Sequence, residues 1–185
     1  MTGRLPLLLE TAISRRLFTF IYGPPGSGKT ILASHVAEAA STTGFKVSYV
    51  YVGSQNAPRT YTPKVASVEA LTLDDLVEKV AASCLSGDYV VVDAINELYT
   101  EQASRGAFRL LSFIASILRR CGGFATGVVR EVEGELRTPG WEALILYAHV
   151  VATSSKSRGR FKLSFSKPEK RVAYFTFDGR GLSWL

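Results

Sequence analysis

A glycine-rich stretch near the N-terminus has the residue types and spacing of a phosphate-binding loop. It reads GPPGSGKT and runs from Gly23 to Thr30. Glycines let backbone N–H groups turn inward around phosphate oxygens, and a helix that begins beside them adds partial positive charge. Lys29 is expected to reach the β- and γ-phosphates, and the Thr30 hydroxyl to bind Mg²⁺. The residues expected to contact the nucleotide are Gly23, Pro24, Pro25, Gly26, Ser27, Gly28, Lys29 and Thr30.

A carboxylate follows an apolar run farther along the chain. Tyr89–Val92 is a short run of β-formers, and Asp93 comes directly after it. If the run is a strand of a parallel sheet, Asp93 lies at the carboxyl edge, where such sheets bind ligands. Thr30 and Asp93 together then form the expected Mg²⁺ site, and ATP with Mg²⁺ is the expected ligand.

The glycine loop needs a strand before it and a helix after it, and the hydrophobic pattern predicts both. Strands are expected at 17–22, 46–52, 89–92, 124–129, 150–154, 160–166 and 172–177, and helices at 29–41, 73–84, 103–121 and 141–147. Residues 132–140 are predicted to form a polar loop. This order predicts an α/β fold with a mostly parallel central sheet, helices on both faces and antiparallel C-terminal edge strands. Residues 1–185 are expected to form a single domain.

The composition is that of an ordinary globular protein, with 46% hydrophobic and 21% charged residues. The apolar patch before Glu10 is too short to cross a membrane, so no membrane partner and a cytoplasmic location are expected. Cys84 and Cys121 show no CxxC or metal-ligand spacing. Both lie near the ends of apolar helical patterns and are predicted to be buried free thiols.

Four segments resemble the RecA-type recombinase family, and within it the short archaeal paralogues of the recombinase RadA, the RadB group. They read FTFIYGPPGSGKTILA (18–33), VVVDAINELY (90–99), GELRTPGWEALILYAHVV (134–151) and FKLSFSKPEKRVAYFTFDGRGLSW (161–184). The resemblance implies a RecA-like P-loop core, with Gly26, Gly28, Lys29 and Thr30 on the phosphates and Asp93 on Mg²⁺. It also implies an accessory role in DNA recombination or repair, beside a RadA-type recombinase or another repair protein.

The chain departs from that family at the position of the catalytic glutamate. In the recombinases the second strand ends in a glutamate that activates the attacking water, whereas the matching position here falls at Gly53 or Ser54. No carboxylate occurs in residues 46–68. Without a positioned base, attack on the γ-phosphate slows by about 10²–10⁴-fold. We therefore expect weak or no ATP hydrolysis, with Glu97 and Glu101 as the open alternatives for a substitute base.

Arg130 stands near the position where the recombinases have a polar amide that senses the γ-phosphate. It is expected either to touch phosphate, and so belongs with the nucleotide-binding candidates, or to face solvent. The following loop, 131–139, is short, whereas its longer counterpart in the recombinases grips single-stranded DNA. A filament-forming recombinase is therefore not expected.

Basic residues are concentrated in the second half of the chain. Residues 1–100 carry 8 Lys and Arg against 9 Asp and Glu, whereas residues 101–185 carry 14 against 7. The excess indicates either a polyanion partner or a solvated basic surface. Sequence-independent contact with DNA, expected to be single-stranded, fits such a set. The DNA-binding candidates are Arg137, Lys156, Arg158, Arg160 and Lys162.

Further residues near the C-terminus leave alternatives open. Lys167, Lys170 and Arg171 extend the basic set, although Lys167 and Lys170 could instead reach the nucleotide of a neighbouring subunit. Tyr174 and Phe175 either stack on bases or belong to a strand with one of them in the core.

Two other functions fit the glycine loop. A small P-loop nucleotide kinase uses the same loop but needs a lid with several arginines, whereas the arginines here lie late, in β-rich sequence. A non-catalytic interaction module without DNA affinity would explain the missing glutamate.

Overall fold

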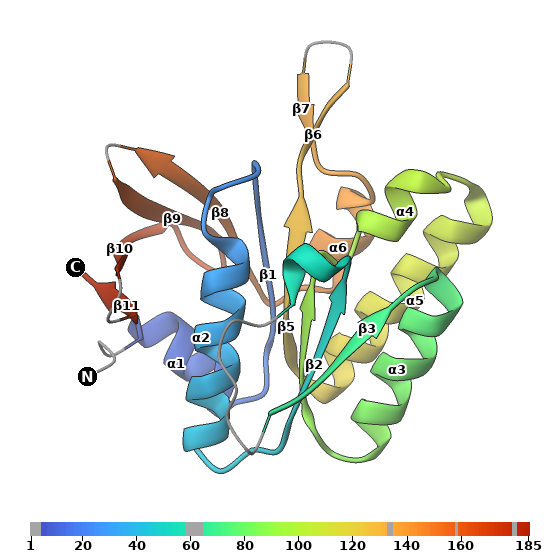
Figure 1. Ribbon diagram of the computed structural model, residues 1–185, viewed down its shortest axis with the longest axis horizontal. Helices are drawn as coiled ribbons and strands as arrows, with labels where there is room; N and C mark the ends of the chain where they lie inside the picture. The colour runs from blue at the N-terminus through green and yellow to red at the C-terminus, as the bar shows by residue number, and fades with distance from the viewer. Residues whose placement is uncertain (1–4, 58–64, 133–134, 158, 179–180) are drawn as a thin grey trace.

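The computed structural model describes residues 5–57, 65–132, 135–157, 159–178 and 181–185 and places nine of its strands in one sheet (Figure 1). The strand order is β11-β10-β9-β8-β1-β5-β4-β2-β3. The strands from β8 to β3 run parallel, and β9, β10 and β11 continue the sheet antiparallel at one edge. The predicted α/β class with antiparallel C-terminal edge strands is confirmed. The bounds are β1 Phe18–Gly23, β2 Val47–Val52, β3 Val65–Ala70, β4 Tyr89–Asp93, β5 Gly123–Val128, β8 Val150–Ser157, β9 Arg160–Lys167, β10 Arg171–Asp178 and β11 Gly181–Trp184.

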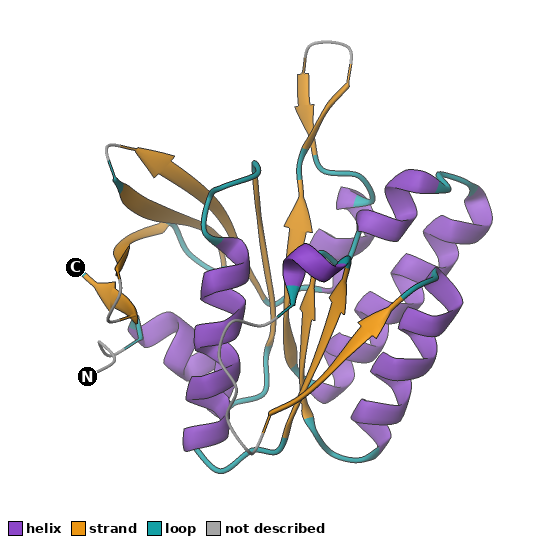
Figure 2. Cartoon of the chain, in the orientation of Figure 1, coloured by secondary structure: helices purple, strands orange, loops and turns teal. Residues whose placement is uncertain are grey.

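Helices cover both faces of the parallel strands (Figure 2). α1 and α2 pack in one hydrophobic cluster, while α3, α5 and α6 pack in a second cluster on the opposite face. In the described part of the chain, no helix is long and apolar enough to cross a membrane. The helices are α1 Leu7–Ser14, α2 Lys29–Thr42, α3 Leu73–Leu85, α4 Glu97–Glu101, α5 Arg105–Cys121 and α6 Trp141–Tyr147.

The central strands are apolar because both of their faces are covered. In β1, Phe18 and Phe20 pack with α5 and α6, whereas Ile21 belongs to the cluster around α2. All five residues of β4 are buried, including Asp93 at its end. This burial explains why the predicted strands read as short, continuous hydrophobic runs.

Side-chain caps set the starts of two crossover helices. The Thr72 hydroxyl accepts a hydrogen bond from the Asp75 N–H at 3.1 Å, which confirms the predicted start of α3. Ser104 caps α5 in the same way, through the Ala107 N–H. α5 therefore begins at Arg105, two residues after the predicted start.

Some elements differ from the prediction. The predicted polar loop at 132–140 overlaps a hairpin of β6 (Arg130–Val132) and β7 (Glu135–Arg137), which projects beyond the carboxyl end of β5 (Figure 1). α1, β3, α4 and β11 were not predicted. α1 is a short helix at the chain start, and β3 and β11 are outer strands of the sheet.

The prediction that Cys84 and Cys121 are buried free thiols is wrong, because the two form a disulfide. Their Cα atoms are 5.7 Å apart, and both residues are half-buried. α3 and α5 pack against each other, and each leads from one parallel strand to the next. Their C-terminal ends therefore meet at the same end of the molecule, which brings the two thiols together although they are 37 residues apart.

Candidate nucleotide-binding site

The glycine loop lies between β1 and α2, at a switch in the winding of the sheet. α2, which follows β1, packs on one face, whereas α6, which follows the neighbouring strand β5, packs on the other. In open α/β sheets, such a switch leaves a ligand-binding crevice at the carboxyl ends of the strands. The predicted phosphate loop is therefore at the place where this fold binds ligands.

The glycine loop is held in its conformation by the backbone of Gly28 and by contacts with the sheet. Gly28 adopts a left-handed backbone conformation with φ 84° just before α2, and a Cβ there would lie 2.8 Å from the Phe161 ring. The Ser154 hydroxyl on β8 donates to the Ser27 carbonyl at 2.6 Å and ties the loop to the sheet. The Lys29 ammonium group bonds the carbonyls of Gly23 and Pro24, at 2.8 and 2.9 Å. Lys29 thus lies over the loop that a triphosphate would occupy.

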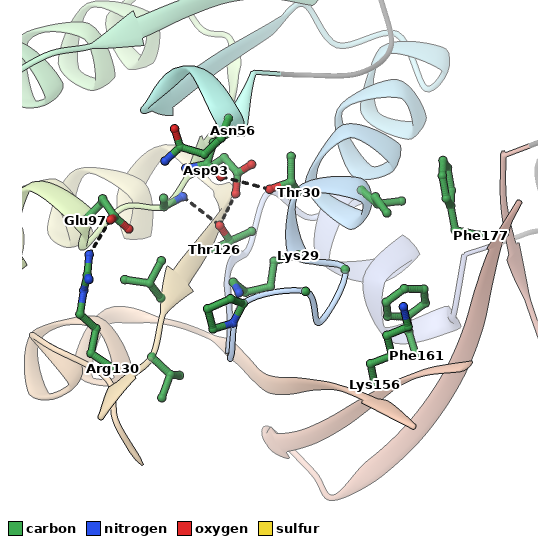
Figure 3. A pocket seen from close by; sticks show the side chains of 18 of the residues that line it. Lys29, Thr30, Asn56, Asp93, Glu97, Thr126, Arg130, Lys156, Phe161 and Phe177 are labelled. Atoms are coloured by element: carbon green, nitrogen blue, oxygen red, sulfur yellow. Dashed lines mark hydrogen bonds and ion pairs between the residues drawn. The ribbon is translucent and has the colours of Figure 1, made fainter. Parts of the chain in front are cut away.

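Asp93 is buried beside the loop, with only 1% of its surface exposed. The hydroxyls of Thr126 and Tyr49 donate to its two carboxylate oxygens, Tyr49 at 3.0 Å. Thr30 also hydrogen-bonds to Asp93 (Figure 3). Burial raises the pKa of Asp93, and these hydrogen bonds together with the charge of Lys29 offset that effect only in part.

The surroundings of Asp93 fit a hard cation. The oxygen atoms that converge there belong to a carboxylate and to neutral hydroxyl groups, and Mg²⁺ prefers such oxygen ligands. A buried carboxylate is costly unless a cation pairs with it, and Asp93 has no direct ion pair among the described residues. Asp93 and Thr30 are the side chains that would hold Mg²⁺, which would neutralise phosphate charge there.

A pocket of about 630 Å³ joins these groups. This size falls in the range of small-molecule sites. Burial lowers the pKa of Lys29, and the carboxylates of Asp93 and Glu97 oppose that shift. The pocket is lined by predicted residues Pro25, Gly26, Gly28, Lys29, Thr30, Asp93, Arg130 and Lys156, and by Ile31, Gln55, Asn56, Ala94, Glu97, Thr126, Val128, Val129, Gly159, Phe161 and Phe177.

The residue that follows β2 is one of the two positions at which the resemblance places the recombinase glutamate. Gly53 follows the strand with φ 77°, a conformation that side chains rarely adopt, and a Cβ there would lie 2.6 Å from the Gln55 side-chain nitrogen. A glutamate at Gly53 would therefore be strained. Asn56 lies here instead, with its side-chain oxygen 3.4 Å from the Thr30 hydroxyl oxygen.

The structure distinguishes the two carboxylates that are alternatives for a substitute base, Glu97 and Glu101. Glu97, the first residue of α4, lines the pocket and forms an ion pair with Arg130 at 2.6 Å. Glu101, at the end of the same helix, is exposed and does not line it. Arg130 lines the pocket, and its side chain is half-exposed.

The predicted DNA-binding residues are not one cluster. Lys156 lies by the pocket with its ammonium group 5.3 Å from the centre of the Phe161 ring. Lys162 pairs across the sheet with Ser155 and Tyr174, so these three share the other face. Arg160 is exposed on the same strand as Lys162, Arg137 is exposed on the β6–β7 hairpin, and Arg158 lies outside the described residues.

Other basic residues near the C-terminus have local partners. Lys167 donates to the carbonyls of Ile145 and Ala148 at the end of α6, and Arg171 pairs with Glu169 at 2.6 Å. Of the two aromatic candidates, Phe175 is fully buried and Tyr174 is 44% exposed.

Several site residues were missed at the sequence level. Tyr49 and Thr126 bond Asp93 from β2 and β5. Asn96 is fully buried and bonds both backbone groups of Val128. The available signal was a polar residue within a buried strand pattern, such as Thr126 in FATGV.

A known protein family matches part of the chain. The family model for the nephrocystin 3 N-terminal region matches residues 10–67, which hold the glycine loop, α2 and β2. This is less than half of the chain. No curated protein matches the chain at a significant level. The resemblance to the recombinases therefore stays a prediction.

Proposed function

We propose that this chain is a RecA-like P-loop protein that binds ATP with Mg²⁺ and acts as an accessory factor in DNA recombination or repair. The observation that carries the proposal is the convergence of Lys29, Thr30 and Asp93 on one pocket at the winding switch of the sheet. Their chemistry matches the lysine, hydroxyl and carboxylate that P-loop proteins direct to phosphates and magnesium.

Slow ATP turnover is part of the proposal. The resemblance places the glutamate of the recombinases at Gly53 or Ser54, and the left-handed backbone of Gly53, with φ 77°, disfavours a side chain there. The bound nucleotide then acts mainly as a conformational signal to a repair partner.

Lys29→Ala tests ATP binding directly. We expect ATP affinity in Mg²⁺ to fall about 10–100-fold, because the variant loses charge-assisted hydrogen bonds to phosphate. Isothermal titration calorimetry measures the change. Lys79→Ala is the matched control, since Lys79 pairs with Asp75 on α3 and does not line the pocket. A wild type that fails to bind ATP would contradict the proposal.

The DNA part of the proposal rests on the face that carries Lys162. Tyr174 is exposed beside Lys162, so a base could stack on the ring while the ammonium group neutralises a phosphate. Thr153, Ser155 and Ser164 share this face with Lys162 and supply further hydrogen-bonding groups. Such a surface suits a single strand without sequence preference.

Single-stranded DNA binding should therefore weaken when this face is altered. We expect the double variant Lys162→Ala/Tyr174→Ala to lose about 10–100-fold in affinity, mostly through lost stacking. The salt dependence should also fall by about 0.7 in slope, because one phosphate contact is removed. Anisotropy of a labelled oligonucleotide measures both, with Lys46→Ala as the control. No salt-dependent binding by the wild type would favour the interaction module without DNA affinity.

A further inference from the structure

The Glu97–Arg130 ion pair forms a part of the pocket wall that is separate from Lys29, Thr30 and Asp93. The Arg130 guanidinium lies 2.6 Å from a Glu97 carboxylate oxygen. The Glu97 side chain is 18% exposed and that of Arg130 50%. Figure 3 shows the pair on the side of the pocket next to Asp93 and Thr126, opposite Phe177 and Lys156. The Glu97 carboxylate and the Arg130 guanidinium therefore both line the space beside the phosphate loop.

The backbone around Glu97 is fixed. Ala94, directly after Asp93, has a left-handed φ of 64°, a strained conformation for a residue with a side chain. Its N–H bonds the Thr126 hydroxyl at 2.9 Å. The buried Asn96 amide accepts from the Val128 N–H at 2.8 Å and donates to the Val128 carbonyl at 3.1 Å. These bonds hold the start of α4, and therefore Glu97, against the strand that leads to Arg130.

We propose that Glu97 is the general base for the slow hydrolysis of bound ATP and that Arg130 restrains it until a γ-phosphate is present. This inference rests on the proposed ATP binding. A water oxygen attacks the γ-phosphorus, and Glu97 takes a proton from that water. The bond from the γ-phosphorus to the bridging oxygen breaks, and its electron pair stays with ADP. The products are ADP and inorganic phosphate.

The alternatives to Glu97 are weaker on the structure. Asp93 already accepts hydrogen bonds from hydroxyls and is assigned to Mg²⁺. Glu101 does not line the pocket. Gln55 does line it and could orient a water, but an amide does not accept the proton.

Arg130 connects this base to the nucleotide. A guanidinium binds either a carboxylate or a phosphate through the same planar donors. The γ-phosphate brings negative charge that ADP lacks, so it competes with Glu97 for Arg130. ATP then draws Arg130 away and frees the Glu97 carboxylate, whereas ADP leaves the pair closed.

Glu97→Gln, with Glu101→Gln as matched control, tests the base. Single-turnover assays with γ-labelled ATP should show turnover reduced about 10²-fold in Glu97→Gln and unchanged in Glu101→Gln. ATP affinity, measured by calorimetry, should tighten several-fold in Glu97→Gln, because Arg130 no longer has a carboxylate partner. Equal turnover in wild type and Glu97→Gln, or loss in Gln55→Ala alone, overturns the assignment. The assignment of Glu97 as the base is also overturned if the wild type hydrolyses ATP no faster than the uncatalysed reaction.

Arg130→Ala tests the restraint through binding alone. We expect the preference for ATP over ADP to fall about 5–10-fold in this variant and to stay unchanged in Arg105→Ala, whose residue is exposed at the start of α5. An unchanged preference in Arg130→Ala overturns the role of Arg130. These failures leave Lys29-dependent ATP binding intact, so they are distinguishable from a failure of the proposed function.

Discussion

Asp93→Asn should make the nucleotide-free protein more stable while removing its magnesium-dependent ATP binding. Asp93 is 1% exposed, and its partners among the described residues are hydroxyl groups rather than a cation in direct contact. Asparagine keeps the size and an acceptor oxygen but carries no charge. The substitution therefore removes a desolvation cost in the free protein and a ligand in the complex.

The pH dependence of the stability gain follows from the raised pKa of Asp93. Its ordinary value is 3.8, and burial raises it in the folded state. At pH values between 3.8 and the raised pKa of the folded state, the folded chain binds more protons than the unfolded chain. Wild-type stability therefore falls as pH rises through that window. The Asp93→Asn variant does not lose stability in this way, because asparagine does not ionise. We expect its advantage to be largest above the window, where Asp93 is ionised, and to fade as pH falls toward 3.8.

The binding loss should be much larger than the stability gain. Mg²⁺ neutralises phosphate charge only where an anionic ligand holds it, so ATP affinity in Mg²⁺ should fall about 100-fold, toward the value measured in EDTA. Thermal melts at several pH values and calorimetry with and without Mg²⁺ measure the two effects.

Asp88→Asn is the control for that experiment. Asp88 is also buried and lies just before the other end of β4, where Ser48 donates to it and Lys46 pairs with it at 3.4 Å. Because Asp88 does not line the pocket, its variant should keep full ATP affinity. Destabilised Asp93→Asn protein, or an unchanged response to Mg²⁺, would contradict the assigned role of Asp93.

The elements that the sequence predicted are those with a strong local pattern. β1, β2 and β4 are short apolar runs next to turn residues, and α2, α3 and α5 have clear starts or stops. β3 (Val65–Ala70) was missed because it is an edge strand whose residues are mostly exposed, so it lacks a hydrophobic pattern. The β6–β7 hairpin was missed for a similar reason, since its sequence is mostly polar.

The residues of the candidate site also fall into those that the sequence predicts and those that it does not. The glycine loop and Asp93 were predictable because each is defined by its own neighbours in sequence. Tyr49, Thr126 and Asn96 were not, because their roles depend on which strands become neighbours and in what register. For example, Thr126 reaches Asp93 only because β5 lies between the loop strand β1 and the strand β4. Glu97 was one of two open choices, and only the fold separates it from Glu101.

Removal of the Cys84–Cys121 disulfide should cost stability without changing the site. The bond closes a loop of 37 residues and joins the C-terminal ends of α3 and α5. In the chain-entropy account such a loop is worth about 2–4 kcal/mol, because the cross-link restricts the unfolded chain. For a chain of this length we expect a melting temperature about 5–15 °C lower in Cys84→Ser/Cys121→Ser.

ATP affinity should survive the same substitution below the melting temperature. α3 and α5 lead from the carboxyl end of one parallel strand to the amino end of the next, so the bridge lies at the amino edge of the sheet. The pocket lies at the carboxyl edge. Melts with and without reductant measure the loss, and reductant should not affect the double variant. Two reactive thiols in the unreduced wild type, or equal melting of the two proteins, would show that the bridge does not stabilise the fold.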